Sequence, residues 1–301
     1  MLIFFANNSR FMKSGRTVKG CGSMRLELHC HSHYSRGRKI PVEAPQSPKS
    51  MVISAKEAGL GGIALTDHDT IRGWKQAKEE AKRLGMLFIP GIEISTASGH
   101  IVGLGLNSAI KKGLSLDETI DIIRQQGGIS VAVHPFDLRG EGVRMDMKKA
   151  DAAEIFNSIN MDKVSNMLAE RHARRLGMPM VVGSDAHSNE MIGSSVNILD
   201  AHTVSSVLRE IKRRRVSFER RYVSAEASVS WSRERMTRSY LSILDYIDKN
   251  YSPPKAWLSR HLLNNYVFSP TDDGYWLWRF MARLGFGASG LYARAKMLKY
   301  Y

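Results

Sequence analysis

The segment that decides the fold is RLELHCHS, residues 25–32. A short run rich in apolar residues ends there in two histidines that are two positions apart. In a β-strand, residues i and i+2 point to the same face, so His29 and His31 face one way while Leu28 and Cys30 face the other. The pattern predicts a strand whose end presents two imidazoles together.

Similar clusters recur along the chain, each at or near an end of a short apolar run: Thr66-Asp67-His68-Asp69, Gly91-Ile92-Glu93, Gly99-His100, Val133-His134-Pro135 and Gly183-Ser184-Asp185-Ala186-His187. If each run is a strand, every cluster lies at the carboxyl end of its strand, where barrels of parallel strands gather catalytic residues. Imidazole and carboxylate groups bind zinc, manganese or iron, so the clusters predict a multinuclear metal site. A lone histidine is more often structural, and this interpretation is given to His33, His172, His202 and His261.

Apolar runs alternate with amphipathic stretches along the body of the chain, as they do in βα units. The strands are predicted at 25–30, 61–66, 86–94, 100–106, 128–133, 152–156 and 179–183. Helices are predicted at 47–59, after a capping Thr70, and at 115–126, 162–176 and 202–215. The sequence therefore predicts an α/β barrel.

These motifs, in this order, resemble those of the PHP family, the polymerase and histidinol phosphatase superfamily of metal-dependent phosphoesterases. The resemblance covers roughly residues 24–224, which predicts a PHP phosphoesterase domain there. It implies a distorted (βα)7 TIM-like barrel with two or three divalent metal ions (Mn²⁺, Zn²⁺ or Fe²⁺) in its mouth. Relatives that trim RNA 5′ ends usually carry a helical insertion between the motifs that match His100 and His134. This chain has room there for one helix only, which favours an open site.

The resemblance also implies a ligand set. A first metal would be held by His29, His31, Glu93 and Asp185, and Glu93 would bridge to a second metal held also by His100 and His134. His68 and His187 would belong to a third metal, or would donate protons to the leaving group. In many relatives the third metal takes an aspartate or histidine a few residues after the first pair of histidines. Here that stretch holds Arg36, and a guanidinium has no lone pair to offer a metal.

Two arginines are candidate clamps for a substrate phosphate, because the planar guanidinium suits a phosphate group. Arg36 would lie beside the metals, although it could instead be a solvated loop residue in the basic run 36–39. Arg139 follows His134 by five residues, in a predicted strand-to-helix loop.

The chemistry of these groups favours phosphate-ester hydrolysis by a metal-bound hydroxide, since divalent cations bind the phosphate oxygens, generate the nucleophile and stabilise the leaving oxygen. We predict a phosphatase or 5′ to 3′ exonuclease that acts on nucleotides or on the ends of RNA or DNA. Two alternatives remain open: an amidohydrolase-type metallohydrolase, and a non-catalytic barrel that serves as a nucleic-acid-binding scaffold.

The composition agrees with a polyanionic partner. The 301 residues include 44 Lys and Arg against 29 Asp and Glu, which gives a formal net charge of +15. The densest basic run contains Arg213, Arg214 and Arg215, which are candidate nucleic-acid contacts or a solvated helix face. The chain has only two cysteines, which favours a cytoplasmic location, and it has no apolar run near the roughly 20 residues that span a membrane.

Both ends of the chain differ from the barrel segment. Residues 1–23 are predicted to be a disordered extension that precedes Met24. Residues 225–301 are predicted to be a basic helical extension that contains aromatic residues and is interrupted at Pro253-Pro254. The favoured interpretation of Trp257, Trp276, Trp278 and Phe280 is a small helical core packed on the barrel, and the alternative is a surface for single-stranded nucleic acid.

Overall fold

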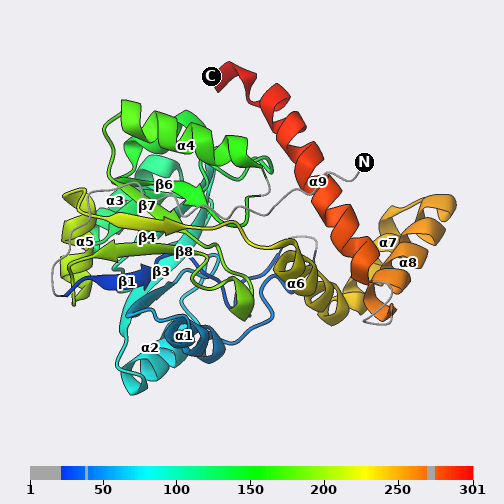
Figure 1. Ribbon diagram of the computed structural model, residues 1–301, viewed down its shortest axis with the longest axis horizontal. Helices are drawn as coiled ribbons and strands as arrows, with labels where there is room; N and C mark the ends of the chain where they lie inside the picture. Colours follow the sequence, from blue (N-terminus) through cyan, green and yellow to red (C-terminus); the bar gives the residue numbers. More distant parts are fainter. Residues whose placement is uncertain (1–21, 38–39, 161, 270–274, 301) are drawn as a thin grey trace, which may run out of the picture.

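The computed structural model describes residues 22–37, 40–160, 162–269 and 275–300. The predicted N-terminal extension falls outside the described residues except for its last two, and Met24 begins the first strand. The described strands form one nine-stranded sheet in the order β7-β6-β5-β4-β3-β2-β1-β8-β9. The sheet curls into a barrel with helices on its outside, and a group of helices extends to one side (Figure 1).

Strands and helices follow one another along the chain in this order: β1 (Met24–Glu27), α1 (Pro48–Glu57), β2 (Gly62–Leu65), α2 (Trp74–Arg83), β3 (Leu87–Thr96), β4 (Gly99–Leu104), α3 (Leu116–Gln125), β5 (Ile129–Ala132), β6 (Ala152–Asn157), α4 (Lys163–Arg175), β7 (Met180–Gly183), β8 (Ser195–Leu199), α5 (Val204–Lys212), β9 (Ser217–Arg220), α6 (Ala225–Arg238), α7 (Tyr240–Asn250), α8 (Pro253–Phe268) and α9 (Tyr275–Lys296). The prediction of an α/β barrel is confirmed. The sequence patterns identified the first seven strands and missed β8 and β9.

The strands do not all run in the same direction. β1, β2 and β3 are parallel, as are β5, β6 and β7, whereas β4 is antiparallel to both of its neighbours. A two-residue connection joins β3 to β4, and it is too short for the helical crossover that parallel strands need. The prediction that every cluster follows the carboxyl end of its strand is therefore wrong for His100, which lies at the start of β4, and for Glu93, which lies inside β3. His100 still lies at the same end of the barrel as the others, because β4 begins where β3 ends.

The side chain of Asn197 links β7 to β8. The backbone N–H of Val182 donates to Asn197 Oδ1 at 3.0 Å, and Asn197 Nδ2 donates to the carbonyl of Val182 at 2.7 Å. Asn197 is completely buried, so no water competes for these bonds. Its amide replaces the backbone hydrogen bonds that paired strands would form between β7 and β8. The sheet therefore nearly closes into a barrel.

Helix starts follow the capping rules in most cases. Ser115 forms a capping box with Glu118 at the start of α3. The predicted cap at Thr70 is wrong, because α2 begins at Trp74 and Thr70 Oγ1 instead accepts from the N–H of Arg72 at 3.2 Å. Glycine occupies position 73, just before that helix.

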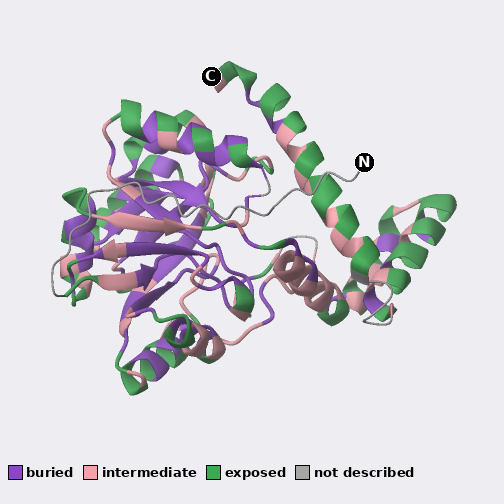
Figure 2. Cartoon of the chain, in the orientation of Figure 1, coloured by how far each residue is buried: buried purple, intermediate pink, exposed green. Residues whose placement is uncertain are grey.

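The core lies between the strands and the surrounding helices, as the burial colours show (Figure 2). Helix α5 places Val207, Leu208 and Ile211 in a buried cluster that also includes Leu104 and Ile129, at the end of β4 and the start of β5. This is the end of the barrel opposite the histidine clusters. α5 therefore closes the far end and leaves the histidine end free.

Helices α7 and α8 share a small core of their own, formed by Ile247, Ala256, Leu263 and Val267, and Met236 of α6 packs against it. The favoured interpretation of the aromatic residues is wrong, because Trp257 is 68% exposed, Trp276 63% and Phe280 50%. Only Trp278 is partly buried, against the ring of Tyr266. Aliphatic side chains fill the space between these helices, which leaves the large rings on the surface. None of the described helices is both long enough and apolar enough to cross a membrane.

The link between β7 and β8 makes a stability prediction. In Asn197→Ala, the N–H and C=O of Val182 lose their partners inside the protein, so the free energy of unfolding should fall by about 2 to 4 kcal/mol. Urea denaturation of the metal-free protein measures the change. Asn107→Ala removes the same side chain at an exposed position and should stay within about 0.5 kcal/mol of wild type. Equal stabilities for the two variants would show that the amide does not hold the barrel closed.

Candidate metal centre

The histidine clusters meet at one end of the barrel, around the carboxylates of Glu93 and Asp185. His29, His31, Glu93 and Asp185 each offer a ligand atom within 4.8 Å of the other three, and all four side chains are buried. The two Nε2 atoms of His29 and His31 lie 3.3 Å apart. His31 Nε2 lies 3.1 Å from both Glu93 Oε2 and Asp185 Oδ1, and His29 Nε2 lies 3.2 Å and 3.5 Å from the same oxygens.

These spacings fit a single small cation. Ligand atoms at about 2.0–2.1 Å from a tetrahedral zinc ion are about 3.3 Å from one another. The five distances in this set run from 3.1 to 3.5 Å. The set, which we call the first position, therefore has the size and the donor types of a metal site, and it contains the four residues that the resemblance assigned to the first metal.

The second oxygen of Glu93 faces a second pair of histidines. His100 Nδ1 lies 2.9 Å and His134 Nε2 lies 3.0 Å from Glu93 Oε1. Among the described residues, the buried Nδ1 of His100 has no hydrogen-bond partner despite this short distance. Two atoms that bind the same ion lie close together without forming a hydrogen bond, and His100 Nδ1 and Glu93 Oε1 show this arrangement. Glu93 is placed to bridge this second position and the first.

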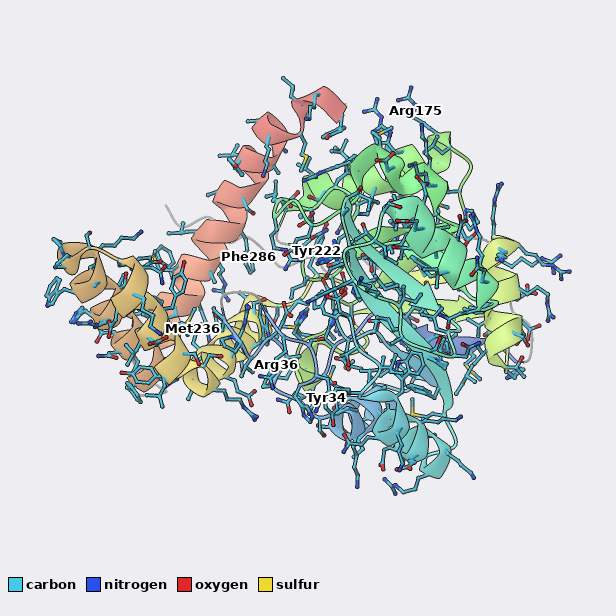
Figure 3. All side chains as sticks on the ribbon, turned by 180° about the vertical axis from the view of Figure 1, so that it is seen from behind. Tyr34, Arg36, Arg175, Tyr222, Met236 and Phe286 are labelled. Atoms are coloured by element: carbon cyan, nitrogen blue, oxygen red, sulfur yellow. The ribbon has the colours of Figure 1, made fainter. Side chains whose placement is uncertain are left out.

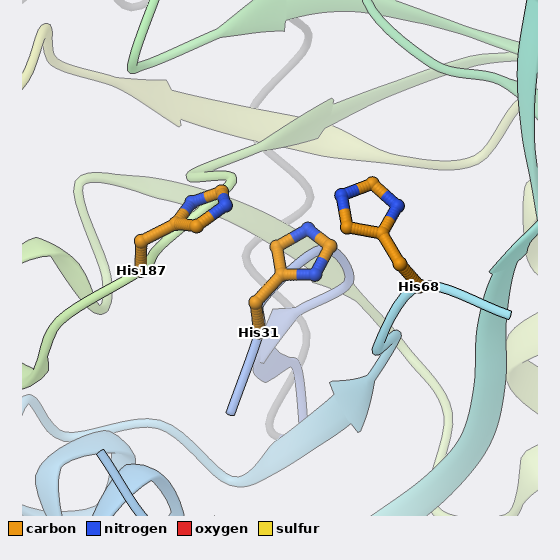
Figure 4. Close-up of side chains that lie close together, drawn as sticks. All are labelled: His31, His68 and His187. Carbon is orange, nitrogen blue, oxygen red and sulfur yellow. The ribbon is translucent and has the colours of Figure 1, made fainter. Parts of the chain in front are cut away.

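His68 and His187 lie on either side of His31 (Figure 4). The ring centroids of His68 and His187 are 4.7 Å and 4.5 Å from that of His31, and the three residues offer nitrogens within 4.8 Å of one another. Burial lowers the pKa of His68 to about 3 and that of His187 to about 4. Both are neutral at pH 7, the form in which imidazole binds a metal.

Glu154, on β6, is a site residue that sequence reasoning missed. Its Oε1 accepts from His29 Nδ1 at 2.9 Å, which leaves the Nε2 lone pair of His29 directed at the first position. Its Oε2 accepts from the backbone N–H of His134 at 2.7 Å. Gly183 makes room for this carboxylate, because a Cβ at position 183 would overlap Glu154 Oε1. A single acidic residue inside an apolar strand was the available signal.

The other two acidic residues of the clusters orient the site from outside. Asp67 accepts from the hydroxyls of Ser32 and Ser35 at 2.7 Å and 2.9 Å. Ser35 Oγ in turn lies 3.0 Å from His31 Nδ1, so the chain Asp67–Ser35–His31 directs His31 Nε2 toward the first position. Asp69 accepts from the N–H of Ser95 at 2.8 Å.

Two of the candidate ligands have a strained backbone. His134 has a φ of 29° and Asp185 a φ of 52°, in the left-handed region that disfavours residues with a side chain. Such conformations persist where the surrounding structure enforces them, and they gather at functional sites. Asp185 also accepts, through its carbonyl, a 2.7 Å hydrogen bond from His187 Nδ1. The bent backbone therefore brings the side chains of both Asp185 and His187 to the metal centre.

Three buried carboxylates, those of Glu93, Asp185 and Glu154, face the histidines of the centre. Burial lowers the pKa of His29, but the carboxylates of Asp185, Glu154 and Glu93 outweigh this and raise it well above its usual value. The histidines in turn hold the pKa values of Glu93 and Asp185 well below the usual range, although burial alone would raise them. The cluster therefore binds protons tightly when no metal competes for it.

The predicted arginines lie in different places. One terminal nitrogen of Arg139 reaches within 4.0 Å of Asp185 Oδ2, and its Nε lies 3.0 Å from Glu141. Arg36 is exposed, where the barrel meets the C-terminal helices (Figure 3), and forms no ion pair with any residue in the described part of the chain. Residues 213–215 follow α5 at the far end of the barrel, and two of them lie within 4.0 Å of Glu210. Of these arginines, Arg139 alone is brought to the metal centre.

The histidines that were assigned structural roles lie outside the first and second positions and apart from His68 and His187. His172 Nε2 donates to the carbonyl of Tyr300 at 2.9 Å, which ties α4 to the end of the chain. His33, His202 and His261 are exposed.

Comparisons with known proteins agree with the geometry. Residues 27–125 match the PHP domain family, and residues 163–216 match the PHP-associated family. An uncharacterized protein of Methanocaldococcus jannaschii is 38% identical over 152 residues, which are 48% of this chain and 89% of that protein. A two-domain protein of Bacteroides vulgatus, titled as containing a predicted PHP-like metal-dependent phosphoesterase, has the same fold, with a TM-score of 0.53 and 18% identity over 72% of this chain and 70% of its own.

Relatives with named activities match smaller parts of the chain. A 5′-3′ exoribonuclease of Haemophilus influenzae is 34% identical over 36% of this chain and 38% of its own length. A 3′,5′-nucleoside bisphosphate phosphatase of Chromobacterium violaceum is 36% identical over 28% of each chain. This chain belongs to the PHP family of metal-dependent phosphoesterases, as the family matches, the M. jannaschii relative covered over 89% of its length and the shared fold show.

Proposed function

We propose that this chain hydrolyses phosphate esters of nucleotides or of oligonucleotide ends, with divalent ions bound at the first and second positions. The observation that carries the proposal is the carboxylate of Glu93. One of its oxygens lies within 3.2 Å of His29 and His31, and the other within 3.0 Å of His100 and His134. A buried carboxylate with two imidazoles near each of its oxygens can bridge two adjacent cations.

Two divalent ions at these positions would supply Lewis acidity, since such ions bind phosphate oxygens and activate water. The chain's own residues orient the ligands. Glu154 holds His29, and the chain from Asp67 through Ser35 holds His31. Arg139 lies at the rim, where its guanidinium can bind the phosphate of a substrate.

The substrate class is supported by charge, access and relatives. His68 and His100 are each 16% exposed, whereas His31 and Glu93 are at most 1% exposed, so a substrate reaches the centre from the side of His68 and His100. The connection from β4 to β5 contains the single helix α3, with no helical cap between them. The two relatives with named activities act, by those names, on RNA and on a nucleoside bisphosphate.

Metal content and hydrolysis test the proposal together. Wild type should bind at least two manganese ions per chain and should release phosphate or nucleotides from a panel of nucleoside monophosphates, 3′,5′-bisphosphates and 5′-phosphorylated oligonucleotides. Glu93→Gln removes the shared charge and should lower the rate by more than about 100-fold, with a loss of bound metal. The exposed Glu190→Gln is the control and should match wild type.

Two outcomes would contradict the proposal. Less than one tightly bound ion per chain, with no hydrolysis after manganese is added, would favour a scaffold. Activity confined to sugar phosphates would remove the nucleotide substrates while leaving the phosphoesterase.

Metal binding should depend on pH. Without metal, carboxylates hold the pKa of His29 well above its usual value, and hydrogen bonds with Asp185 and Glu93 raise the pKa of His31 to about 10 although burial lowers it. Both imidazoles are then protonated at pH 7 and must lose a proton to bind a metal. Manganese affinity should therefore rise between pH 6 and 9, by about tenfold per pH unit for each proton released. Calorimetry in buffers of different ionisation enthalpy counts the protons, and a count of zero would place the metal elsewhere.

The two candidate phosphate clamps can be separated by substitution. Arg139→Ala removes the guanidinium nearest Asp185 and should raise the KM for a phosphorylated oligonucleotide by about 10- to 100-fold. Arg36→Ala removes an exposed guanidinium and should change KM by less than about twofold. Steady-state kinetics at saturating manganese measures both. The reverse order of effects would assign the clamp to Arg36.

A further inference from the structure

We propose that Glu43 is the carboxylate ligand of the third metal position and that helix α6 holds it there. The inference rests on the proposed metal centre and adds to it a ligand outside the family motifs. The segment after His31 offers Arg36 where a metal-binding side chain is expected. Glu43 supplies the missing carboxylate from the returning side of the same loop.

The loop geometry explains how a residue so far along the chain reaches the site. The backbones of Arg36 and Val42 pair in an antiparallel bridge, so the chain that leaves at Arg36 returns beside it. Glu43 follows directly, and its Oε2 lies 3.6 Å from His68 Nε2. Its Oε1 lies 4.0 Å from His187 Nε2. The carboxylate therefore faces His68 and His187, the two histidines assigned to the third metal.

The electrostatics of these contacts call for a cation. The carbonyl of Asp185 can only accept, so His187 Nδ1 carries the proton and His187 Nε2 presents a lone pair to Glu43. A carboxylate and a lone pair repel each other unless a positive ion lies between them. Glu43 Oε2 is buried and has no hydrogen-bond partner among the described residues, although its side chain as a whole is 15% exposed. A buried oxygen without a partner is costly unless a ligand satisfies it.

Helix α6 fixes the backbone that carries this side chain. Trp231 Nε1 donates to the carbonyl of Glu43 at 2.9 Å, and Arg235 Nε donates to the carbonyl of Val42 at 3.0 Å. The N–H of Val42 donates to Ser239 Oγ, just after α6, at 3.1 Å. The ring of Trp231 also lies 5.3 Å from the ring of His187. Part of the C-terminal extension thus builds one wall of the metal centre, and Trp231 is a positioning residue for the third ion.

Manganese titration of the full-length, metal-free protein tests this inference. Calorimetry and metal analysis after dialysis should give three ions per wild-type chain, one each at the first, second and third positions. Glu43→Gln keeps the shape of the side chain and removes its charge, so one site should weaken by at least about 100-fold while the other two stay unchanged. Trp231→Phe removes the N–H that holds the Glu43 carbonyl and should weaken the same site by about tenfold.

Glu234→Gln is the matched control, since Glu234 lies on α6 and bonds to Gln46 and Arg238 rather than to the site. It should bind three ions with wild-type affinities. Circular dichroism of each metal-free variant checks that the fold is retained.

The outcomes separate this inference from the proposed function. Three unchanged sites in Glu43→Gln would overturn the role of Glu43. Two sites in wild type would also overturn it, while leaving the proposed pair of ions at Glu93 intact. Fewer than one ion in wild type would overturn both.

Discussion

The carboxylate of Glu93 sits almost completely buried at the end of the barrel, and the rest of the metal centre is arranged around it. Moving such a charge out of water costs several kcal/mol unless partners compensate. Asp185 and Glu154 are buried beside it, which adds further negative charge. Six histidines from separate parts of the sheet converge on this charge, and Gly183 and the strained backbones of His134 and Asp185 permit the approach. Protons or metal ions must balance the charge, and the size of the site suits metal ions.

Residues that lie close along a strand could be identified from the sequence alone. His29 and His31 share a face because of the two-residue period of a strand, and the same holds for Asp185 and His187. Glu154 could not be identified, because one acidic residue in an apolar strand also fits a solvent-facing position. Glu43 and Trp231 are 188 residues apart, and only the folded loop and helix bring them together. Local patterns contain no information about such a contact.

The errors in the fold have similar physical causes. β9 was missed because all four of its residues are only partly buried, so it has no alternating pattern. β8 was missed because it buries the polar Asn197 where a predicted strand would bury an apolar residue. The direction of β4 depended on the length of the connection before it, which is clear only once the end of β3 is known. The exposed tryptophans were misassigned because aromatic content does not show which side of a helix faces its neighbours.

The contact between β7 and β8 would give an ion at the first position a structural role as well as a chemical one. Between these two strands the described hydrogen bonds are those of the Asn197 amide, and beyond the strand ends the backbone N–H of His31 donates to the carbonyl of Ala186 at 2.8 Å. The ligands of the first position come from both sides of the line between β7 and β8. Asp185 follows β7, whereas His29 and His31 follow β1, which pairs with β8. An ion bound there would join the two edges of the sheet. Removing the ion would weaken the contact between these two edges, so a centre built for chemistry would also contribute to the stability of the barrel.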